Sequence, residues 1–337
     1  MNNPDLRMLI VVPNWLGDGV MAMPALQALR EAVHPAAKLF TGARPGQQAL
    51  WQMQSAVDEV LALPASTGKL PELVRHLKSF QFSHAVILPH SFRSALLPGL
   101  SGIPLRRGTV FQWGRGLWVN DPVDLSDLDE KHQQWEIAKL LLPTPLPENL
   151  PAPQLQPSPE ARRQAAAWLQ ELPVPRLACI PGAARGPSKQ WPGERFQQVA
   201  EAWIQETCGS VCWLGTAADI ELCSALNQPL GSSGKSLAGQ TDLQTFTALL
   251  AACDHALVND SGGMHLAAAA GTPLTAVFGS TDPRKTGPLS SAARVIQHCD
   301  QRSRSIGRKS REGEAALARV TVQEVVEAVL AKLPSRT

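Results

Sequence analysis

The segment VNDSGGMHLAAAAGTPLTAVFG, residues 258–279, decides the fold. An apolar run ends at Asn259 and Asp260, two glycines follow, an alanine-rich helix is predicted at 261–271, and a second apolar run occupies 273–279. Strand, helix and strand in this order form a β-α-β unit, which predicts a parallel sheet. The N–H groups at the start of the helix then lie at the carboxyl edge of that sheet, where they suit a diphosphate.

The same alternation continues in both directions from this segment. Further apolar runs that predict buried strands are residues 8–14, 37–43, 58–63, 84–90, 176–182 and 210–215. Residues 143–159 contain seven prolines and predict a linker. We therefore expect an α/β protein with two doubly wound, Rossmann-like domains, at 1–150 and 151–320, and a ligand cleft between their strand ends. A C-terminal helix (321–337) is expected to pack back on the N-terminal domain.

Composition limits the function classes. The chain has 337 residues, of which 44% are hydrophobic and 18% charged, as expected for packed globular domains. The net charge of +2 gives no argument for a nucleic-acid partner. The six cysteines form no CxxC pair, so buried free thiols in a reducing compartment are expected.

The start of the chain, MNNPDLRMLIVVPNW, lacks the long apolar run of a signal peptide. No stretch approaches 18 consecutive apolar residues, so no membrane span is expected. A cytoplasmic protein is predicted, and peripheral contact with the inner membrane stays open.

The helix start after Asp260 is the clearest candidate site. Gly262 and Gly263 allow a close approach of the backbone to a ligand, and Asp260, Ser261 and His265 can face the same ligand. The alternative is that Asp260 or Ser261 is only an N-cap and that His265 is a hydrogen-bonded core residue.

A second candidate is IPGAARGPSKQWPGERF (180–196), a predicted strand followed by a loop. Lys189 on this loop can reach a phosphate as a point charge. The alternative is a solvated loop lysine, and Trp191 is expected to be a packing residue.

A third candidate is PNWLGDGVMAMPALQALR (13–30), in which Asp18 lies in the first turn of a helix. As an N-cap it stabilises the helix by about 1 kcal/mol. As a carboxylate in a cleft it can accept a proton from a hydroxyl group. The residues alone leave both interpretations open, because the helix dipole keeps the carboxylate ionised and also weakens it as a base.

No dinucleotide fingerprint, Walker loop, nucleophile elbow or zinc-binding HExxH pair is present, and no metal site is expected. Two groups of basic residues stand out, either as solvated loops or as contacts for an anionic acceptor or membrane. They are Arg93, Arg106, Arg107 and Arg115 in the first domain and Arg302, Arg304, Arg308, Lys309 and Arg311 in the second.

Five strings resemble the heptosyltransferase family of inverting glycosyltransferases, glycosyltransferase family 9, which has the GT-B fold. They are PNWLGD (13–18), LPHSFRSAL (88–96), GIPLRRG (102–108), PGAARGPSKQWP (181–192) and NDSGGMHLAAA (259–269). The resemblance implies transfer of L-glycero-D-manno-heptose from ADP-heptose to the lipopolysaccharide inner core of a Gram-negative envelope. The NWLGD form favours the member whose acceptor is the first heptose on Kdo-lipid A.

The resemblance also implies residue roles. Asp18 matches the proposed general base, Lys189 the diphosphate contact, and Asp260 a contact near the heptose. The remaining donor contacts would be Ala184, Arg185, Asp219 or Glu221, Ser261, Gly262, Gly263 and His265. The acceptor contacts would be Asn14, Trp15, Arg93, Arg106 and Arg107. Ala184 and Arg185 stand where some members have hydroxyl residues, and the alignment of Asp219 and Glu221 is not secure.

The implied mechanism is one in-line displacement with inversion, in which domain closure excludes water and neither metal nor cofactor is required. Three alternatives stay open at this point. They are another nucleotide-sugar transferase of the same fold, including a heptosyltransferase with a different acceptor; a non-catalytic nucleotide-sugar-binding module; and a basic interaction protein that uses residues 302–311.

Overall fold

The structure is a computed structural model that describes residues 3–63, 70–303, 307 and 310–331. The chain divides into two compact units, Met1–Pro153 and Gln154–Thr337. The division falls inside the proline-rich stretch 143–159. Arg304, Arg308 and Lys309 of the predicted basic loop lie outside the described residues.

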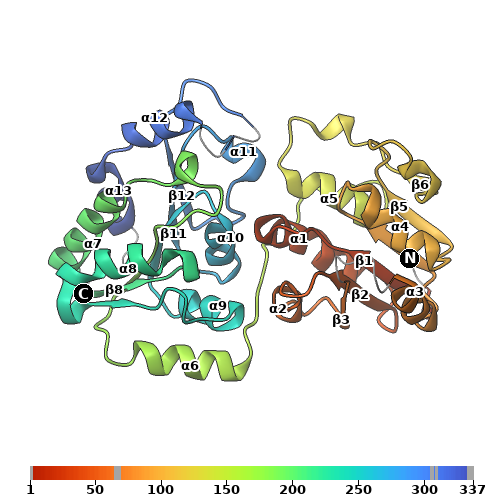
Figure 1. Cartoon of the computed structure of the whole chain (residues 1–337), viewed down its shortest axis with the longest axis horizontal. Helices are drawn as coiled ribbons and strands as arrows, with labels where there is room; N and C mark the ends of the chain where they lie inside the picture. The colour runs from red at the N-terminus through yellow and green to blue at the C-terminus, as the bar shows by residue number, and fades with distance from the viewer. Residues whose placement is uncertain (1–2, 64–69, 304–306, 308–309, 332–337) are drawn as a thin grey trace. The chain divides into compact units, whose positions relative to one another are not determined.

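The N-terminal unit is built on one parallel six-stranded sheet in the order β3-β2-β1-β4-β5-β6 (Figure 1). Its elements are β1 (Arg7–Val11), α1 (Leu16–Ala32), β2 (Lys38–Ala43), α2 (Gln48–Gln52), β3 (Glu59–Ala62), α3 (Leu70–Ser79), β4 (His84–Ile87), α4 (Phe92–Leu100), β5 (Leu105–Gly108), η1 (Arg115–Leu117), β6 (Asp121–Pro122), η2 (Ser126–Leu128) and α5 (Gln133–Leu141). Leu9 and Ile10 of the central strand are fully buried, as expected for a parallel strand covered on both faces.

The C-terminal unit repeats this plan with the order β12-β11-β10-β7-β8-β9 (Figure 1). Its elements are α6 (Pro159–Leu169), β7 (Arg176–Ile180), η3 (Pro187–Lys189), α7 (Gly193–Thr207), β8 (Ser210–Trp213), η4 (Ala217–Asp219), α8 (Ile220–Asn227), η5 (Gln228–Ser233), β9 (Gly234–Ser236), α9 (Leu243–Ala251), β10 (His255–Asn259), α10 (Gly262–Ala269), β11 (Leu274–Phe278), α11 (Pro283–Thr286), β12 (Ala293–Gln297), α12 (Arg311–Arg319) and α13 (Val322–Leu330).

Both sheets therefore have the strand order 3-2-1-4-5-6 when strands are counted within each unit. The direction of winding reverses between β1 and β4 in one unit and between β7 and β10 in the other. Ligands of such sheets bind at the carboxyl ends of the strands at this reversal. The prediction of two doubly wound, Rossmann-like units is confirmed.

The C-terminal helix α13 contributes to the core of the C-terminal unit. Val325 and Val329 of α13 are buried in the core of the C-terminal unit together with Trp203 of α7. Its described part packs on α7 within the C-terminal unit, and the expected packing against the N-terminal domain stays a prediction. A capping box between Thr321 and Glu324 begins the helix.

All six cysteines are free thiols. Four are buried as predicted: Cys179, Cys212, Cys223 and Cys253. Burial raises the pKa of Cys223 and of Cys253 to about 12, so neither thiol is reactive at neutral pH. Cys208 differs, because it is exposed at the C-cap of α7 with a left-handed backbone. Within the described residues, no helix has the length and hydropathy needed to cross a membrane.

Candidate functional site

A buried ion pair joins two strand-end loops of the C-terminal unit. Lys189 Nζ lies 2.5 Å from Asp260 Oδ2, and the two side chains are 11% and 6% exposed. The lysine follows β7 and the aspartate follows β10, which are parallel neighbours in the sheet. These two predicted site residues, 71 positions apart in the chain, therefore meet at the carboxyl edge.

Asn259 holds the same two loops in place. Its side chain is fully buried, accepts a hydrogen bond from Trp191 N (3.0 Å) and donates one to Pro181 O (2.7 Å). Trp191 is also fully buried, and its indole N–H donates to Val320 O. The prediction that Trp191 is a packing residue is confirmed. Asn259 was not assigned a role from the sequence, although it directly precedes Asp260.

The start of α10 has no side-chain cap. Ser261 is the N-cap residue but accepts no hydrogen bond from the first turn, and its buried Oγ has no hydrogen-bond partner in the described part of the chain. Met264 N donates to Ser261 O at 3.2 Å, whereas the N–H groups of Gly262 and Gly263 find no acceptor among the described residues, which is the arrangement of an anion site. His265 is buried one turn further along.

The packing of α10 against β7 explains why position 263 is a glycine, which the sequence alone does not show. A Cβ atom at this position would lie 2.8 Å from Ile180 Cδ1. The absence of a side chain thus allows α10 to approach the end of β7. The glycine at position 263 thus has a packing role, and the close approach of a ligand there stays a prediction.

A third strand-end loop, residues 279–282, brings hydroxyl groups to the same edge. It follows β11, the other neighbour of β10. Ser280 Oγ and Thr281 Oγ1 are buried and have no hydrogen-bond partner among the described residues. Neither residue is predictable from the sequence, because a Ser-Thr pair after a strand is indistinguishable from an ordinary turn.

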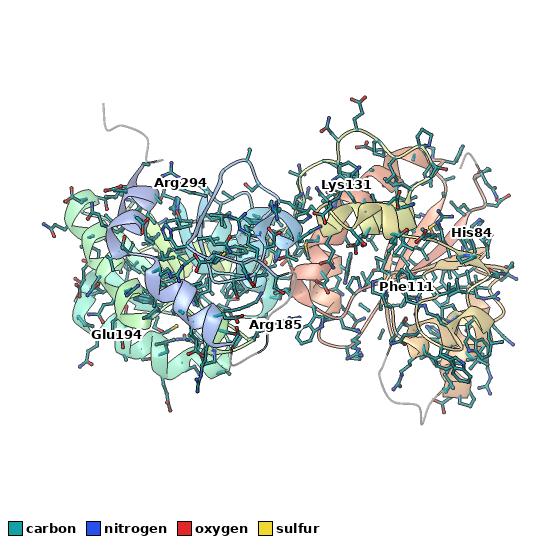
Figure 2. The ribbon with its side chains drawn as sticks, turned by 90° about the horizontal axis from the view of Figure 1, so that it is seen from above. His84, Phe111, Lys131, Arg185, Glu194 and Arg294 are labelled. Carbon is teal, nitrogen blue, oxygen red and sulfur yellow. The ribbon has the colours of Figure 1, made fainter. Side chains whose placement is uncertain are left out.

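The remaining predicted donor contacts are Asp219, Glu221, Ala184 and Arg185, all in the C-terminal unit. Asp219 accepts hydrogen bonds from Thr216 N and Thr216 Oγ1, both 2.8 Å, in a capping box, and its carboxylate lies against Gly182 after β7. Glu221 is exposed on α8. Ala184 and Arg185 lie on an exposed turn of the C-terminal unit, where Figure 2 marks Arg185. Of the two acids, Asp219 is therefore the one at the strand-end edge.

At the matching edge of the N-terminal unit, Asp18 lies half-buried in the first turn of α1. Trp15 is the N-cap residue and is 61% exposed. The main-chain carbonyl of Asn14 accepts a hydrogen bond from Gln47 Nε2. Asp18 is not the N-cap residue, because Trp15 occupies that position. This removes one of the two interpretations of Asp18 left open above.

The arginines of this unit separate into two groups. Arg106 donates to the carbonyl oxygens of Trp118 and Ile103, and Arg107 pairs with Asp121 at 2.8 Å. Both predicted acceptor contacts are thus engaged by the protein itself. Arg93 is exposed, with no hydrogen bond or ion pair to its side chain from the described residues.

No group of three or more His, Cys, Asp or Glu side chains suited to a metal ion occurs within the described residues. Of the basic loop 302–311, Arg302 donates to Gln297 Oε1 at 2.8 Å, and Arg311 begins α12.

Comparison with known proteins identifies the family. A family model described as glycosyltransferase family 9 (heptosyltransferase) matches residues 71–316, which is more than half of the chain. The chain belongs to this family. It is a glycosyltransferase, and the sequence-based predictions of family and enzyme class are confirmed.

Two relatives named heptosyltransferase 2 align with most of the length of this chain. Lipopolysaccharide heptosyltransferase 2 of Escherichia coli is 33% identical, over 97% of this chain and 99% of the relative. Lipooligosaccharide heptosyltransferase 2 of Haemophilus ducreyi is 31% identical, over 88% of this chain and 89% of the relative.

The solved structure of Escherichia coli ADP-heptose lipopolysaccharide heptosyltransferase II matches with a TM-score of 0.84 and 30% identity, over 97% of this chain and 98% of that chain. The match supports the GT-B assignment. Another Escherichia coli heptosyltransferase, solved with ADP, shares the fold at a TM-score of 0.72 and 19% identity, over 95% of this chain and 98% of that chain.

Proposed function

We propose that this glycosyltransferase moves L-glycero-D-manno-heptose from ADP-heptose to the first heptose of the lipopolysaccharide inner core, on a Kdo-lipid A base. The observation that carries the proposal is the buried Lys189–Asp260 pair beside the uncapped start of α10. The relatives named heptosyltransferase 2 give the reaction its sugar and its acceptor.

On the donor side, Lys189 and the N–H groups at the start of α10 bind the diphosphate. Negative charge grows on this group as the bond from the anomeric carbon to phosphate breaks. A lysine and a helix N-terminus supply positive charge without a metal ion, so we propose transfer that needs no metal and no cofactor. Asp260 orients Lys189 and faces the sugar, and Ser261, Ser280 and Thr281 offer hydroxyl groups to the donor.

On the acceptor side, Asp18 is the general base. Its carboxylate takes the proton as the acceptor hydroxyl oxygen forms its bond to the anomeric carbon, and ADP leaves with the bonding electron pair. Among the proposed acceptor contacts, Arg93 is available to bind the acceptor. Arg106 and Arg107 instead donate to main-chain carbonyl oxygens, and Arg107 also pairs with Asp121, so both hold the fold around β5. Asn14 and Trp15 lie directly before the helix of Asp18.

The proposed site of action is the cytoplasmic face of the inner membrane, with peripheral contact. Seven of the ten large apolar side chains exposed in the described chain lie between residues 92 and 117. Trp113 is 97%, Leu117 77% and Phe111 66% exposed, and such side chains suit a bilayer interface. Loss of vesicle binding in Trp113→Ser and Leu117→Ser, but not in the exposed control Val174→Ser, would support this contact; equal binding by all three would remove it.

The function is tested by mass measurement of product. The protein is incubated with ADP-heptose and a lipopolysaccharide acceptor that ends at the first heptose, and gain of one heptosyl residue is expected. Stabilisation by ADP but not by UDP or GDP in a thermal-shift assay is the expected donor selectivity. Absence of product with this acceptor, despite product with one that lacks the first heptose, would assign the chain to a different step.

A further inference from the structure

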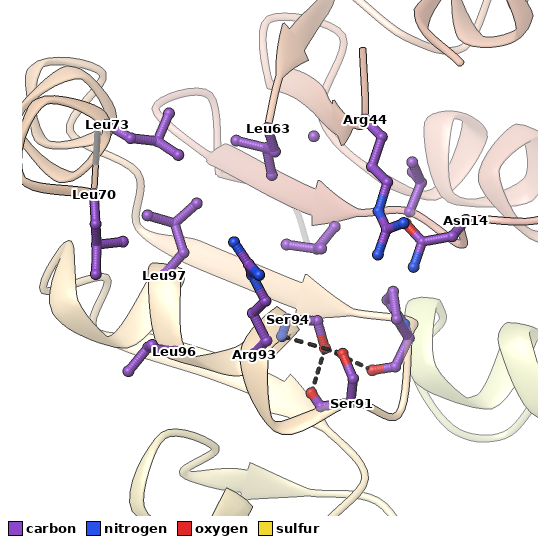
Figure 3. Close-up of a pocket in the computed structure, with 14 residues that line it drawn as sticks. Asn14, Arg44, Leu63, Leu70, Leu73, Ser91, Arg93, Ser94, Leu96 and Leu97 are labelled. Carbon is purple, nitrogen blue, oxygen red and sulfur yellow. Dashed lines mark hydrogen bonds between the residues drawn. The ribbon is translucent and has the colours of Figure 1, made fainter. Parts of the chain in front are cut away.

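A pocket opens at the carboxyl edge of the N-terminal sheet (Figure 3). Its lining comes from the carboxyl ends of three strands and the loops or helix that follow them: Val11 and Asn14 at β1, Gly42 and Arg44 at β2, and Pro89, Ser91, Arg93, Ser94, Leu96 and Leu97 in the loop after β4 and the first turns of α4. It therefore lies at the point where the strand order reverses, which is the usual ligand position in such a sheet.

Two arginines direct their charged ends into this pocket. Figure 3 shows Arg44 and Arg93 approaching from opposite walls with their guanidinium groups toward one another. None of the described residues that line the pocket is acidic. Within the described residues, neither guanidinium makes a hydrogen bond or an ion pair. Two cations held on facing walls repel one another, and an anion between them removes this repulsion.

A third guanidinium lies behind the pocket wall. Arg115 is fully buried and pairs with no acid among the described residues; its Nη1 donates to Ser91 O and, at 3.0 Å, to Ser94 Oγ. Burial lowers its pKa to about 10, so at neutral pH the group stays charged. Ser91 and Ser94 both line the pocket, so Arg115 adds positive potential there and positions the first turn of α4.

The N-terminus of α4 is not itself the anion site. Ser91 Oγ accepts the N–H of Ser94 at 3.3 Å, and the N–H of Phe92 donates to Gln112 Oε1 at 2.7 Å. These groups are already satisfied, so binding of an anion depends on the arginine side chains. Apolar side chains, mostly leucines, form much of the remaining wall.

We propose that Arg44 and Arg93 form a subsite for an anionic group of the acceptor, a phosphate or a carboxylate, held by paired N–H donors. This rests on the proposed function, because the acceptor is taken to be the anionic lipid-linked saccharide. Arg93 was predicted as an acceptor contact from the sequence. Arg44 was not, and the structure assigns it to the same subsite. The pair selects the acceptor by its charge and takes no part in the proton transfer.

The test compares Arg44→Gln and Arg93→Gln with Arg75→Gln, a matched exposed arginine on α3 of the same unit. Each pocket variant should raise KM for the acceptor by about tenfold or more, because a charge-assisted hydrogen bond is lost. The KM for ADP-heptose should stay within about twofold, since the donor residues are untouched. KM values for the acceptor equal to that of Arg75→Gln would overturn the proposal.

Two modified acceptors identify the source of the anion. One has its phosphates removed and the other has its sugar carboxylates converted to methyl esters. The penalty of Arg44→Gln should disappear on one of them, and that acceptor names the group bound. An equal penalty on both modified acceptors and on the native one would contradict a role in anion recognition.

A second measurement separates this proposal from the proposed function. The full chain, without donor, is titrated with inorganic phosphate and with acetate while the arginine Nε–H signals are followed by NMR. Shifts that vanish in Arg44→Gln and Arg93→Gln would support the subsite even if no heptose were transferred. Transfer by the wild type without any such shifts, and with an unchanged KM in the variants, would remove the subsite and keep the function.

Discussion

The carboxyl edges of the two sheets share one topology but differ in whether their basic side chains are paired with an acid. In the C-terminal unit, Lys189 is buried and paired with Asp260. In the N-terminal unit, Arg44 and Arg93 are exposed and face a pocket whose described lining holds no acid. The fold therefore decides where a ligand binds, and the local pairing of side chains decides how it is bound. A ligand of the first edge shares its lysine with a carboxylate, whereas a ligand of the second edge supplies the missing negative charge.

The largest expected effect concerns Asp18, the acid at the start of α1. Asp18→Asn should lower kcat by about 10²–10⁴-fold through loss of the base, with the Kd for ADP-heptose unchanged. Single-turnover kinetics and calorimetry measure the two quantities. Glu31→Gln, exposed on the same helix, is the control. A wild-type kcat in Asp18→Asn would mean that Asp18 is not the base and that the N-terminal edge only binds the acceptor.

The ion pair of the C-terminal edge gives the next largest effect. Asp260→Ala leaves the buried charge of Lys189 without its partner and should lower the free energy of unfolding by about 3–5 kcal/mol. The double variant Lys189→Met, Asp260→Leu should recover most of this stability, although it would not bind donor. Chemical denaturation measures both. A stable Asp260→Ala single variant would mean that this edge tolerates unpaired charge as the other edge does.

Asn259 tests whether the loops of the C-terminal edge are held rigidly. Asn259→Ala leaves Trp191 N and Pro181 O buried without their partner and should cost about 2–3 kcal/mol of stability. Asn259→Asp keeps an acceptor for Trp191 N but loses the donor to Pro181 O. An intermediate cost for Asn259→Asp is the expected order, and equal stability of all three proteins would contradict the bridging role.

The smallest effect is expected at the unpaired arginines. Arg44→Gln and Arg93→Gln should change the free energy of unfolding by no more than about 0.5 kcal/mol, because no described contact is lost. Added salt should weaken acceptor binding of the wild type more than that of either variant. A large loss of stability in these variants would mean that the arginines stabilise the folded chain, and the two edges would then not differ in the way described.

Much of the fold could be predicted from the sequence because its central strands are apolar and buried. The expected strands at 8–14, 37–43, 84–90 and 176–182 correspond to β1, β2, β4 and β7. Strands β5, β6, β9 and β12 were not predicted. β5 has the sequence LRRG, β6 has two residues and β9 three, so none shows the run of apolar residues that marks a strand.

The site was predictable only in part. Asp260 was found because it stands between a predicted strand and a glycine-led helix start, and Lys189 because it lies on a loop after a predicted strand; both also lie in strings that resemble the heptosyltransferase family. The roles of Arg106 and Arg107 depend on carbonyl groups and an aspartate that only the folded chain brings near. Arg44 follows a buried strand too, but a single exposed arginine after a strand carries no signal until the opposite wall of the pocket is known.

The hydrogen bond from the Trp191 indole to Val320 has a practical consequence for anyone handling this protein. Val320 lies between α12 and α13, and its carbonyl also accepts from Arg195 Nη1 at 2.5 Å. These two bonds join the connection between α12 and α13 to the segment that carries Lys189. Shortening the C-terminus as far as this point would remove both bonds. A C-terminal truncation that reaches Val320 should therefore release the segment that carries Lys189 from this contact.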